Sequence, residues 1–461
     1  MRRTGAIVVT LGLIGSGLAV GPSVVSAGAP PGQDDAQNAV LRWNEVTAEA
    51  EVTSGITPIF DPLHESRINA MVQVAVHDAL NSIDRRYEPY ALDIGPWPDA
   101  SPKAAVAAAA SEVLKAELPR LPAELSPDVQ GALTMVDQAY TDTLAAVPDG
   151  PGERRGIFLG RAAAAVIVAK RAGDGAEAPF LDPTYIATKY PEQQYPDGPP
   201  PGTYRYFEGA PIAVAPMWGA VTPFALPEAD YVAAQPPSPL TSQQYARDLN
   251  EIKELGGQNS TSRTPEQTEI ARFWFEASPL RWNRIARTVA AHADLDLWDS
   301  ARMLALMDLA MADGYIANWE AKYRFDRWRP ETAIRLADLD GNPATEPDPT
   351  WVPLWGSSGA TPEHDSGHAI EGGAAATVLR RFFGTDRIRF SICSYTMPAG
   401  GNCGEAGQVN RTFTRFSEAA VENAESRILI GWHLRTSVEQ GLDRGTKIGR
   451  FTFRHFLRPV S

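Results

Sequence analysis

Helical spacing of apolar side chains is the feature that most constrains the fold of this chain. Residues 102–117 and 153–171 are rich in alanine, the strongest helix former, and no segment alternates as a half-buried strand would. Further helices are predicted at 283–293, 298–322, 366–383 and 416–433, one from Thr264 onward, and one at 68–83 with apolar positions Ile68, Met71, Val72, Ala75, Ala79, Leu80 and Ile83. The sequence therefore predicts an all-α fold, a helical bundle joined by long loops rich in proline and glycine.

Three parts follow one another along the 461 residues. Residues 1–27 read as a secretory signal peptide, because Arg2 and Arg3 precede an apolar run over 5–20 and small residues follow it. Residues 28–235 form an N-terminal helical region that ends in a long proline-rich connection, and 236–461 form a C-terminal helical domain. We therefore expect a secreted protein, and the sequence leaves the export route open.

The two cysteines, Cys393 and Cys403, flank a glycine-rich stretch. Disulfides persist in exported proteins, so we expect this close pair to be joined. Two cysteines do not make a structural zinc site by themselves, and no nearby histidine spacing completes one.

The chain is acidic overall but contains one strongly basic segment, residues 322–329. The net charge of −14 argues against binding of nucleic acid or of an anionic membrane surface. Against this background Lys322, Arg324, Arg327 and Arg329 fall within eight residues and are offset only by Asp326. We interpret Arg324 and Arg327 as a solvated face, whereas Lys322 and Arg329 are expected to face a bound anion. Pro330 disfavours helical backbone at the residue before it, which frees Arg329 to point inward.

Two later segments carry the residues that would complete an anion site. In T-P-E-H-D-S-G-H-A, residues 361–369, Ser366 and Gly367 begin a helix whose free N–H groups can bind an oxyanion, and His368 is placed for proton transfer. In S-R-I-L-I-G-W-H, residues 426–433, Arg427 and His433 would diverge by about 120° on a straight helix. Guanidinium, ammonium, hydroxyl, N–H and imidazole groups together suit a tetrahedral oxyanion and repel a bare cation.

These segments carry a resemblance to a known family. K-x6-R-P, S-G-H and S-R-x5-H, in this order, resemble the three signature blocks of the type 2 phosphatidic acid phosphatase and haloperoxidase superfamily. The surrounding residues are most similar to its vanadium-dependent haloperoxidase branch. The resemblance implies a vanadate cofactor held by Lys322, Arg329, Ser366, Gly367 and Arg427, with His433 as axial ligand to vanadium. It further implies that His368, His433 and Lys322 act in catalysis, and that Trp319 and Thr361 lie along the halide path.

The activity that the resemblance implies is oxidation of bromide or chloride by hydrogen peroxide to hypohalous acid, which halogenates a small organic acceptor. One alternative is an acid phosphatase that cleaves phosphate monoesters through a phosphohistidine at His433. Another is a non-catalytic protein that binds phosphate or vanadate. The halide, the organic acceptor and any homo-oligomer formation are left open.

Three positions depart from the family pattern. Asp365 stands where proline is usual, which is unfavourable beside an anion unless the carboxylate caps the helix or pairs with an arginine. Ser437 stands where relatives often carry aspartate, so His433 is expected to lack a carboxylate partner and to hold vanadate less tightly. The alternative is that another acceptor, such as a backbone carbonyl, already serves His433 and that Ser437 only fills space. Thr361 replaces an aromatic residue or histidine. His364 could line the site or be partly exposed.

Overall fold

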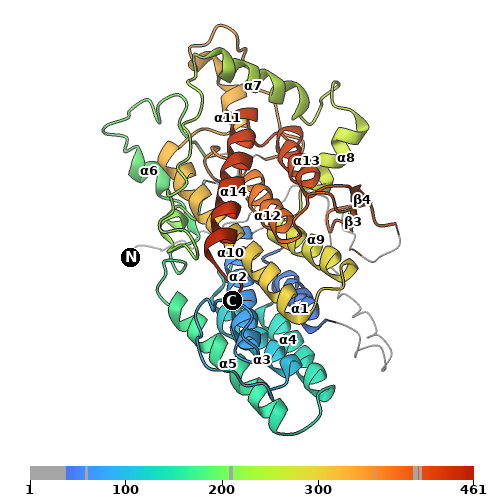
Figure 1. Cartoon of the computed structure of the whole chain (residues 1–461). Coiled ribbons are helices and arrows are strands. Elements are labelled where there is room, and N and C mark those ends of the chain that lie inside the picture. The colour runs from blue at the N-terminus through green and yellow to red at the C-terminus, as the bar shows by residue number, and fades with distance from the viewer. Residues whose placement is uncertain are drawn as a thin grey trace, which may run out of the picture.

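The computed structural model describes residues 38–57, 61–206, 211–357, 359–397, 403 and 407–460. The predicted signal peptide lies outside these residues. The described part contains fourteen α-helices and two small two-stranded sheets, so the prediction of an all-α fold is confirmed (Figure 1). None of the described helices is long and apolar enough to span a membrane.

Five helices build the N-terminal part, and glycine lets two of them approach closely. A side chain at Gly160 would lie 2.3 Å from the carbonyl oxygen of Ala105. The helices that carry these two residues can therefore pack this closely only because glycine has no side chain. The capping hydroxyl of Ser101, before Pro102, begins the alanine-rich helix where the sequence predicted it. The helices are α1 (Ala39–Ser54), α2 (Pro62–Asn81), α3 (Pro102–Glu117), α4 (Val129–Ala145) and α5 (Pro151–Arg171).

The C-terminal part packs its other helices around α10 (Leu297–Phe325) and α12 (Gly367–Phe382) (Figure 1). Thr264 forms the predicted capping box at the start of α8. The predicted helix over 416–433 is too long, because α13 ends at Leu429 and Gly431 turns the chain with a φ of +88°. The other helices of this part are α7 (Gln243–Leu255), α8 (Pro265–Phe273), α9 (Ser278–His292), α11 (Pro330–Arg335), α13 (Phe416–Leu429) and α14 (Arg435–His455), and the short α6 (Tyr185–Lys189) lies in the proline-rich connection.

Helix α14 was not predicted, because its three regularly spaced glycines disfavour a helix by propensity. Packing overrides that propensity here. A side chain at Gly445 would lie 1.7 Å from the carbonyl oxygen of Ile370 on α12, so the two helices meet backbone to backbone. Both helices begin beside the three predicted site segments, and their close contact fixes the separation of these two N-termini.

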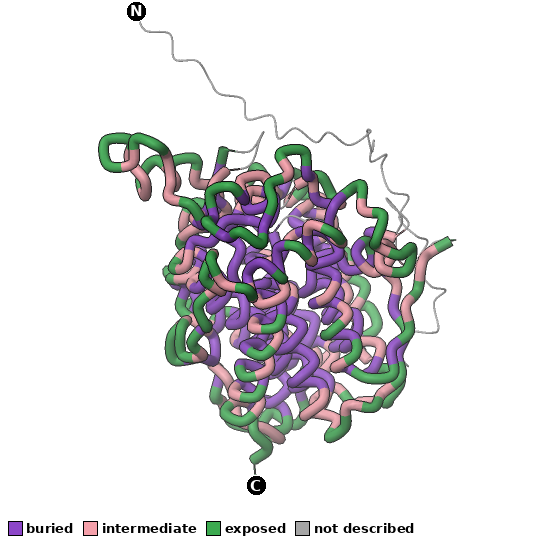
Figure 2. Tube along the Cα trace, turned by 90° about the horizontal axis from the view of Figure 1, so that it is seen from above, coloured by how far each residue is buried: buried purple, intermediate pink, exposed green. Residues whose placement is uncertain are grey.

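One hydrophobic core joins the two predicted parts, and buried residues fill the centre of the molecule (Figure 2). Helix α2 packs along α10, and the core includes Met71 and Val72 from α2 together with Leu304 and Met311 from α10. The boundary near residue 235 stays a prediction.

The strands belong to loops that border the site. β1 (Leu181–Asp182) pairs antiparallel with β2 (Ala213–Val214), and β3 (Phe390–Cys393) pairs antiparallel with β4 (Asn410–Phe413). Cys393 and Cys403 form a disulfide with a Cα–Cα distance of 5.5 Å, as predicted. The proline-rich connection lies against α10, where Trp319 Nε1 donates a hydrogen bond of 3.2 Å to the Val214 carbonyl oxygen.

Candidate oxyanion site

The three predicted segments converge at the C-terminal end of α10, the N-terminus of α12 and the turn between α13 and α14. Lys322 lies in the last turn of α10, and Arg329 is the N-cap of α11 with extended backbone (φ −74°, ψ 157°), as expected before Pro330. Ser366 is the N-cap of α12, and Arg427 lies in the last turn of α13. The fold thus brings together segments that are about 100 residues apart in sequence.

Lys322 and Arg329 are buried and are held by backbone carbonyl groups. Lys322 Nζ donates to the carbonyl oxygens of Pro362 (2.9 Å) and Glu363 (3.0 Å), which leaves one of its three N–H donors for a ligand. Burial, together with the positive charge of Arg329, lowers the pKa of the Lys322 ammonium well below its usual value. A bound anion would stabilise the charged form of this side chain.

Thr361 supports Arg329 directly. Arg329 Nε donates to the Thr361 carbonyl oxygen at 2.6 Å, and Arg329 Nη2 donates to Thr361 Oγ1 at 2.5 Å. The Thr361 hydroxyl is therefore engaged with the guanidinium. Trp319, the other residue predicted on the halide path, is buried, and its indole lies 3.9 Å from the position that a side chain on Gly367 would take.

Several buried donors of the site make no hydrogen bond to any described residue. They are the Ser366 hydroxyl and the Nε and Nη2 atoms of Arg427, whose Nη1 donates to the Trp274 carbonyl oxygen at 2.9 Å. Burial and the neighbouring Arg281 lower the pKa of the Arg427 guanidinium to about 9. At Gly367 a side chain would lie 3.2 Å from Asn318 Oδ1, so the start of α12 is too tightly packed to hold a larger residue without a shift.

His368 lies in the first turn of α12, where the sequence placed it. Its Nε2 is 3.3 Å from the Glu276 carbonyl oxygen, and its own carbonyl oxygen accepts a 3.0 Å hydrogen bond from Asn423. Burial and the positive charges of Arg427 and Arg281 lower the pKa of His368 well below its usual value. The imidazole is therefore neutral at physiological pH and able to accept a proton.

His433 lies in the turn between α13 and α14, so the predicted divergence from Arg427 along one straight helix is wrong. Its Nε2 is 3.2 Å from Arg329 Nη1, which can only donate, so Nε2 carries no proton. Its Nδ1 is 3.0 Å from Glu363 Oε1, a carboxylate acceptor. Burial and the charges of Lys322 and Arg329 lower the pKa of His433 well below its usual value. The neutral ring is thus oriented with an unprotonated Nε2 facing Arg329.

Glu363 is the site residue that the sequence analysis missed. Its fully buried carboxylate accepts hydrogen bonds from His433 Nδ1, from the Leu434 backbone N–H at 3.0 Å and from the Ser437 hydroxyl at 2.6 Å. The expectation that Ser437 leaves His433 without a carboxylate partner is therefore wrong. The only signal in the sequence was the position of Glu363 inside the second motif.

Three further charged residues, Asp365, Arg327 and Arg324, lie close to the site segments in sequence. Asp365 is buried, and its Oδ2 lies 3.4 Å from Nη1 of Arg444 on α14, so it pairs with an arginine as the sequence analysis allowed. Arg327 was expected on a solvated face but is buried, with Nη2 donating to the Ser238 carbonyl oxygen at 2.7 Å. Arg324 is exposed, as expected, and it pairs with Glu320.

Arg281 adds a further positive charge beside the site. It is fully buried on α9, stacks 4.6 Å over the Trp274 ring and lies 3.3 Å from the Glu276 carboxylate. Burial lowers the pKa of the Arg281 guanidinium to about 10. Its charge reaches both Arg427 and His368, as their lowered pKa values show.

The donor set matches an oxyanion better than a cation. The positive charges of Lys322, Arg329 and Arg427 all act on His433, and the buried Ser366 hydroxyl has no partner among the described residues. The described residues contain no group of three or more His, Cys, Asp or Glu that could hold a metal ion. Tetrahedral vanadate, which presents oxygens outward, is therefore compatible with these residues, and so is phosphate.

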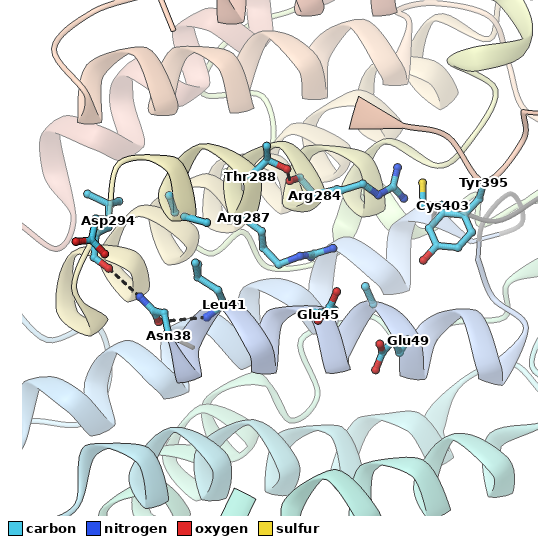
Figure 3. A pocket seen from close by; sticks show the side chains of 14 residues that line it. Asn38, Leu41, Glu45, Glu49, Arg284, Arg287, Thr288, Asp294, Tyr395 and Cys403 are labelled. Atoms are coloured by element: carbon cyan, nitrogen blue, oxygen red, sulfur yellow. Dashed lines mark hydrogen bonds between the residues drawn. The ribbon is translucent and has the colours of Figure 1, made fainter. Parts of the chain in front are cut away.

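A separate cleft of about 460 Å³ opens between α1 and α9 (Figure 3). Arg284 and Arg287 line it from α9, and Glu45 and Glu49 line it from α1. None of the predicted oxyanion ligands contributes to its lining. Its mixed charges do not form the cationic pocket described above.

In fold and in its converging motifs, the chain is similar to the vanadium haloperoxidase branch of the type 2 phosphatidic acid phosphatase superfamily, as its sequence predicted. The family model described as the VCPO second helical-bundle domain matches residues 302–461, which include every predicted site residue. Vanadium chloroperoxidase of Curvularia inaequalis is 26% identical over 423 residues, covering 75% of this chain. The chain spans 66% of the length of that relative.

Solved structures share the fold. A bacterial vanadium-dependent iodoperoxidase superposes with a TM-score of 0.69 at 23% identity, covering 91% of this chain and 97% of that protein. The apo form of a bacterial vanadium-dependent chloroperoxidase gives a TM-score of 0.66 at 18% identity, covering 87% of this chain and 95% of that protein. The fold extends over both the N-terminal and the C-terminal helices.

Proposed function

We propose that this chain is a vanadium-dependent haloperoxidase that uses hydrogen peroxide to oxidise bromide or chloride to hypohalous acid. One observation carries the proposal: buried donors of Ser366 and Arg427 have no partner among the described residues and lie with Lys322 and Arg329 beside a neutral His433. Relatives named as vanadium chloroperoxidase and vanadium-dependent iodoperoxidase support the choice of halide chemistry.

Each residue has a distinct task in this proposal. Lys322, Arg329, Ser366, Gly367 and Arg427 would hold the vanadate oxygens, and His433 Nε2 would be the ligand to vanadium. When bound, vanadate activates hydrogen peroxide for oxygen transfer to a halide. The positive side chains stabilise negative charge on the anion and on its bound substrate.

His368 is the proposed residue that accepts and donates protons during turnover. Hydrogen peroxide, one halide ion and one proton give one molecule of hypohalous acid and one of water, so each turnover consumes a proton. A neutral His368 can take a proton from incoming hydrogen peroxide and return it to the peroxide oxygen that leaves as water. Its lowered pKa keeps it in the accepting form before peroxide arrives. The hypohalous acid then halogenates a small organic acceptor.

Trp319 and Thr361 are the proposed residues of the halide path. The polar atoms of both are engaged, Thr361 Oγ1 with Arg329 and Trp319 Nε1 with the Val214 carbonyl oxygen. A halide would therefore meet the Trp319 ring rather than a free hydroxyl. The named relatives include both a chloroperoxidase and an iodoperoxidase.

The deciding experiment measures halide oxidation by the purified protein at increasing orthovanadate, with chloride, bromide and iodide in parallel. We expect vanadate-dependent oxidation of bromide that phosphate suppresses competitively. Ser366→Ala should weaken vanadate binding, whereas Arg324→Met, on the exposed face of α10, is the matched control and should not.

The same preparations should be tested for hydrolysis of phosphate monoesters. Strong hydrolysis with no halide oxidation at any vanadate concentration would contradict the proposal and favour the phosphatase alternative. Tight binding of both anions without either activity would favour the non-catalytic alternative.

A further inference from the structure

A chain of hydrogen bonds extends from His433 away from the oxyanion donors. The Glu363 carboxylate accepts from His433 Nδ1 with one oxygen and from Ser437 Oγ, at 2.6 Å, with the other. Ser437 Oγ is also 2.8 Å from His364 Nδ1, and His364 Nε2 is 2.8 Å from the Gln235 carbonyl oxygen. Glu363, Ser437 and His364, which we call the supporting triad, are buried.

The donors in this triad can be counted. A carbonyl oxygen only accepts, so His364 Nε2 must carry a proton to bond Gln235. The Ser437 hydroxyl donates to Glu363 Oε2 and also contacts His364 Nδ1. Ser437 therefore links His364 to the carboxylate that holds His433.

The surroundings of the triad are also well defined. Lys322, Arg327 and Arg329 all interact electrostatically with the Glu363 carboxylate. The His364 ring is packed at 5.5 Å against the edge of Phe325. The triad is therefore held in place from both ends.

We infer that His364 is a positioning residue that acts on His433 through Ser437 and Glu363. A carboxylate that accepts from both sides cannot rotate, so it fixes the plane of the His433 ring and keeps the proton on Nδ1. This leaves Nε2 free to bond the central atom of a bound oxyanion. The inference rests on the proposed role of His433 in oxyanion binding, but it does not depend on halide oxidation.

The first test uses the unmodified protein with ¹⁵N-labelled histidine at neutral pH, without vanadate. We expect His433 to be protonated at Nδ1 and bare at Nε2. The variant His433→Asn assigns its signals by their loss, and His364→Asn should shift them because it removes the far end of the chain. A bare Nδ1 on His433, or His433 signals unchanged in His364→Asn, would overturn the proposal.

The second test is a double-mutant cycle on orthovanadate binding by the full-length protein, with inorganic phosphate as a second probe. Glu363→Ala should weaken vanadate binding by about 10–100-fold, the usual cost of losing the partner of a ligating histidine. Ser437→Ala should weaken it less. Because Ser437 acts through Glu363, the double variant should bind like Glu363→Ala alone.

Losses that multiply in the double variant would overturn the coupling. Thr436→Val is the matched control, because the adjacent Thr436 hydroxyl bonds Asp248 instead of the triad. Should Glu363→Ala fail to fold, Glu363→Gln replaces it in the cycle. A protein that shows the expected histidine signals and binds vanadate but oxidises no halide would contradict only the proposed function.

Discussion

The Asp365 carboxylate and the Arg444 guanidinium form a buried ion pair, with Arg444 Nη1 3.4 Å from Asp365 Oδ2. The pair joins the loop before α12 to the middle of α14. It offsets a negative charge that would otherwise stand directly beside Ser366. Asn318 adds a 2.9 Å hydrogen bond to the Asp365 carbonyl oxygen and also contacts its carboxylate. An aspartate next to the anion site is thus compatible with anion binding.

Breaking this pair should be costly. Arg444→Met leaves Asp365 buried without its partner, so we expect the free energy of unfolding to fall by about 3–5 kcal/mol. Phosphate and vanadate binding should weaken as well, because the uncompensated carboxylate repels them. Denaturant unfolding and anion titration measure the two effects. Arg450→Met, exposed on the same helix, is the control. Equal stability of both variants would contradict the role of the pair.

Replacement of His433 and replacement of His368 should affect vanadate binding and turnover differently. His433→Ala removes the only proposed ligand to vanadium, so vanadate retention should fall severely. His368→Ala should retain vanadate better but lose turnover, since it removes the group that exchanges protons with peroxide. Equilibrium dialysis with vanadate, alongside steady-state bromide oxidation, separates these outcomes. Equal losses of binding in both variants would contradict the assignment.

Ser437→Asp should weaken vanadate binding by about tenfold or more rather than tighten it. The sequence alone suggested that an aspartate here would restore a missing partner of His433, but Glu363 already fills that role. The Ser437 hydroxyl lies 2.6 Å from Glu363 Oε2, so a second carboxylate would repel the first and disturb His433. Vanadate titration of the wild type and this variant measures the change. Tighter binding would show that the triad is not the support of His433.

The contribution of Asp308 to stability should fall as pH rises from about 4 to 8. Burial raises the pKa of this carboxyl to about 8 in the folded protein. Between the unfolded pKa of about 3.9 and this value, the folded state binds a proton that the unfolded state has released, so unfolding becomes easier with increasing pH.

Asp308→Asn should remove that share of the pH dependence, on the order of a few kcal/mol. Asparagine can keep the 2.8 Å hydrogen bond from Asn283 to its side-chain oxygen. Unfolding curves at pH 5 and pH 8 give the comparison, with the exposed Asp443→Asn as control. Part of the slope should remain, because burial also raises the pKa of Glu65 to about 8. An unchanged slope in Asp308→Asn would contradict the prediction.

Local chemistry made much of the fold and site predictable from the sequence. Pro330 predicted the extended backbone of Arg329, and Thr264 with Gln267 predicted a capped helix. The partnership of Glu363 with His433 was not predictable, because it joins residues 70 positions apart and depends on how two turns meet. Arg327 was mistaken for a surface residue because its burial depends on Tyr245, over whose ring it lies at 5.1 Å.

The backbone contact between α12 and α14 has a consequence for how such a protein can diversify. With Gly445 pressed against the Ile370 carbonyl group, no side chain is available there to be exchanged for a larger or smaller one. In the proposed haloperoxidase, we expect changes in halide choice to come instead from the segment around Thr361 and from the proline-rich connection that meets Trp319. Libraries directed at these loops should yield altered halide selectivity, while libraries directed at the helix pair should yield mostly insoluble protein.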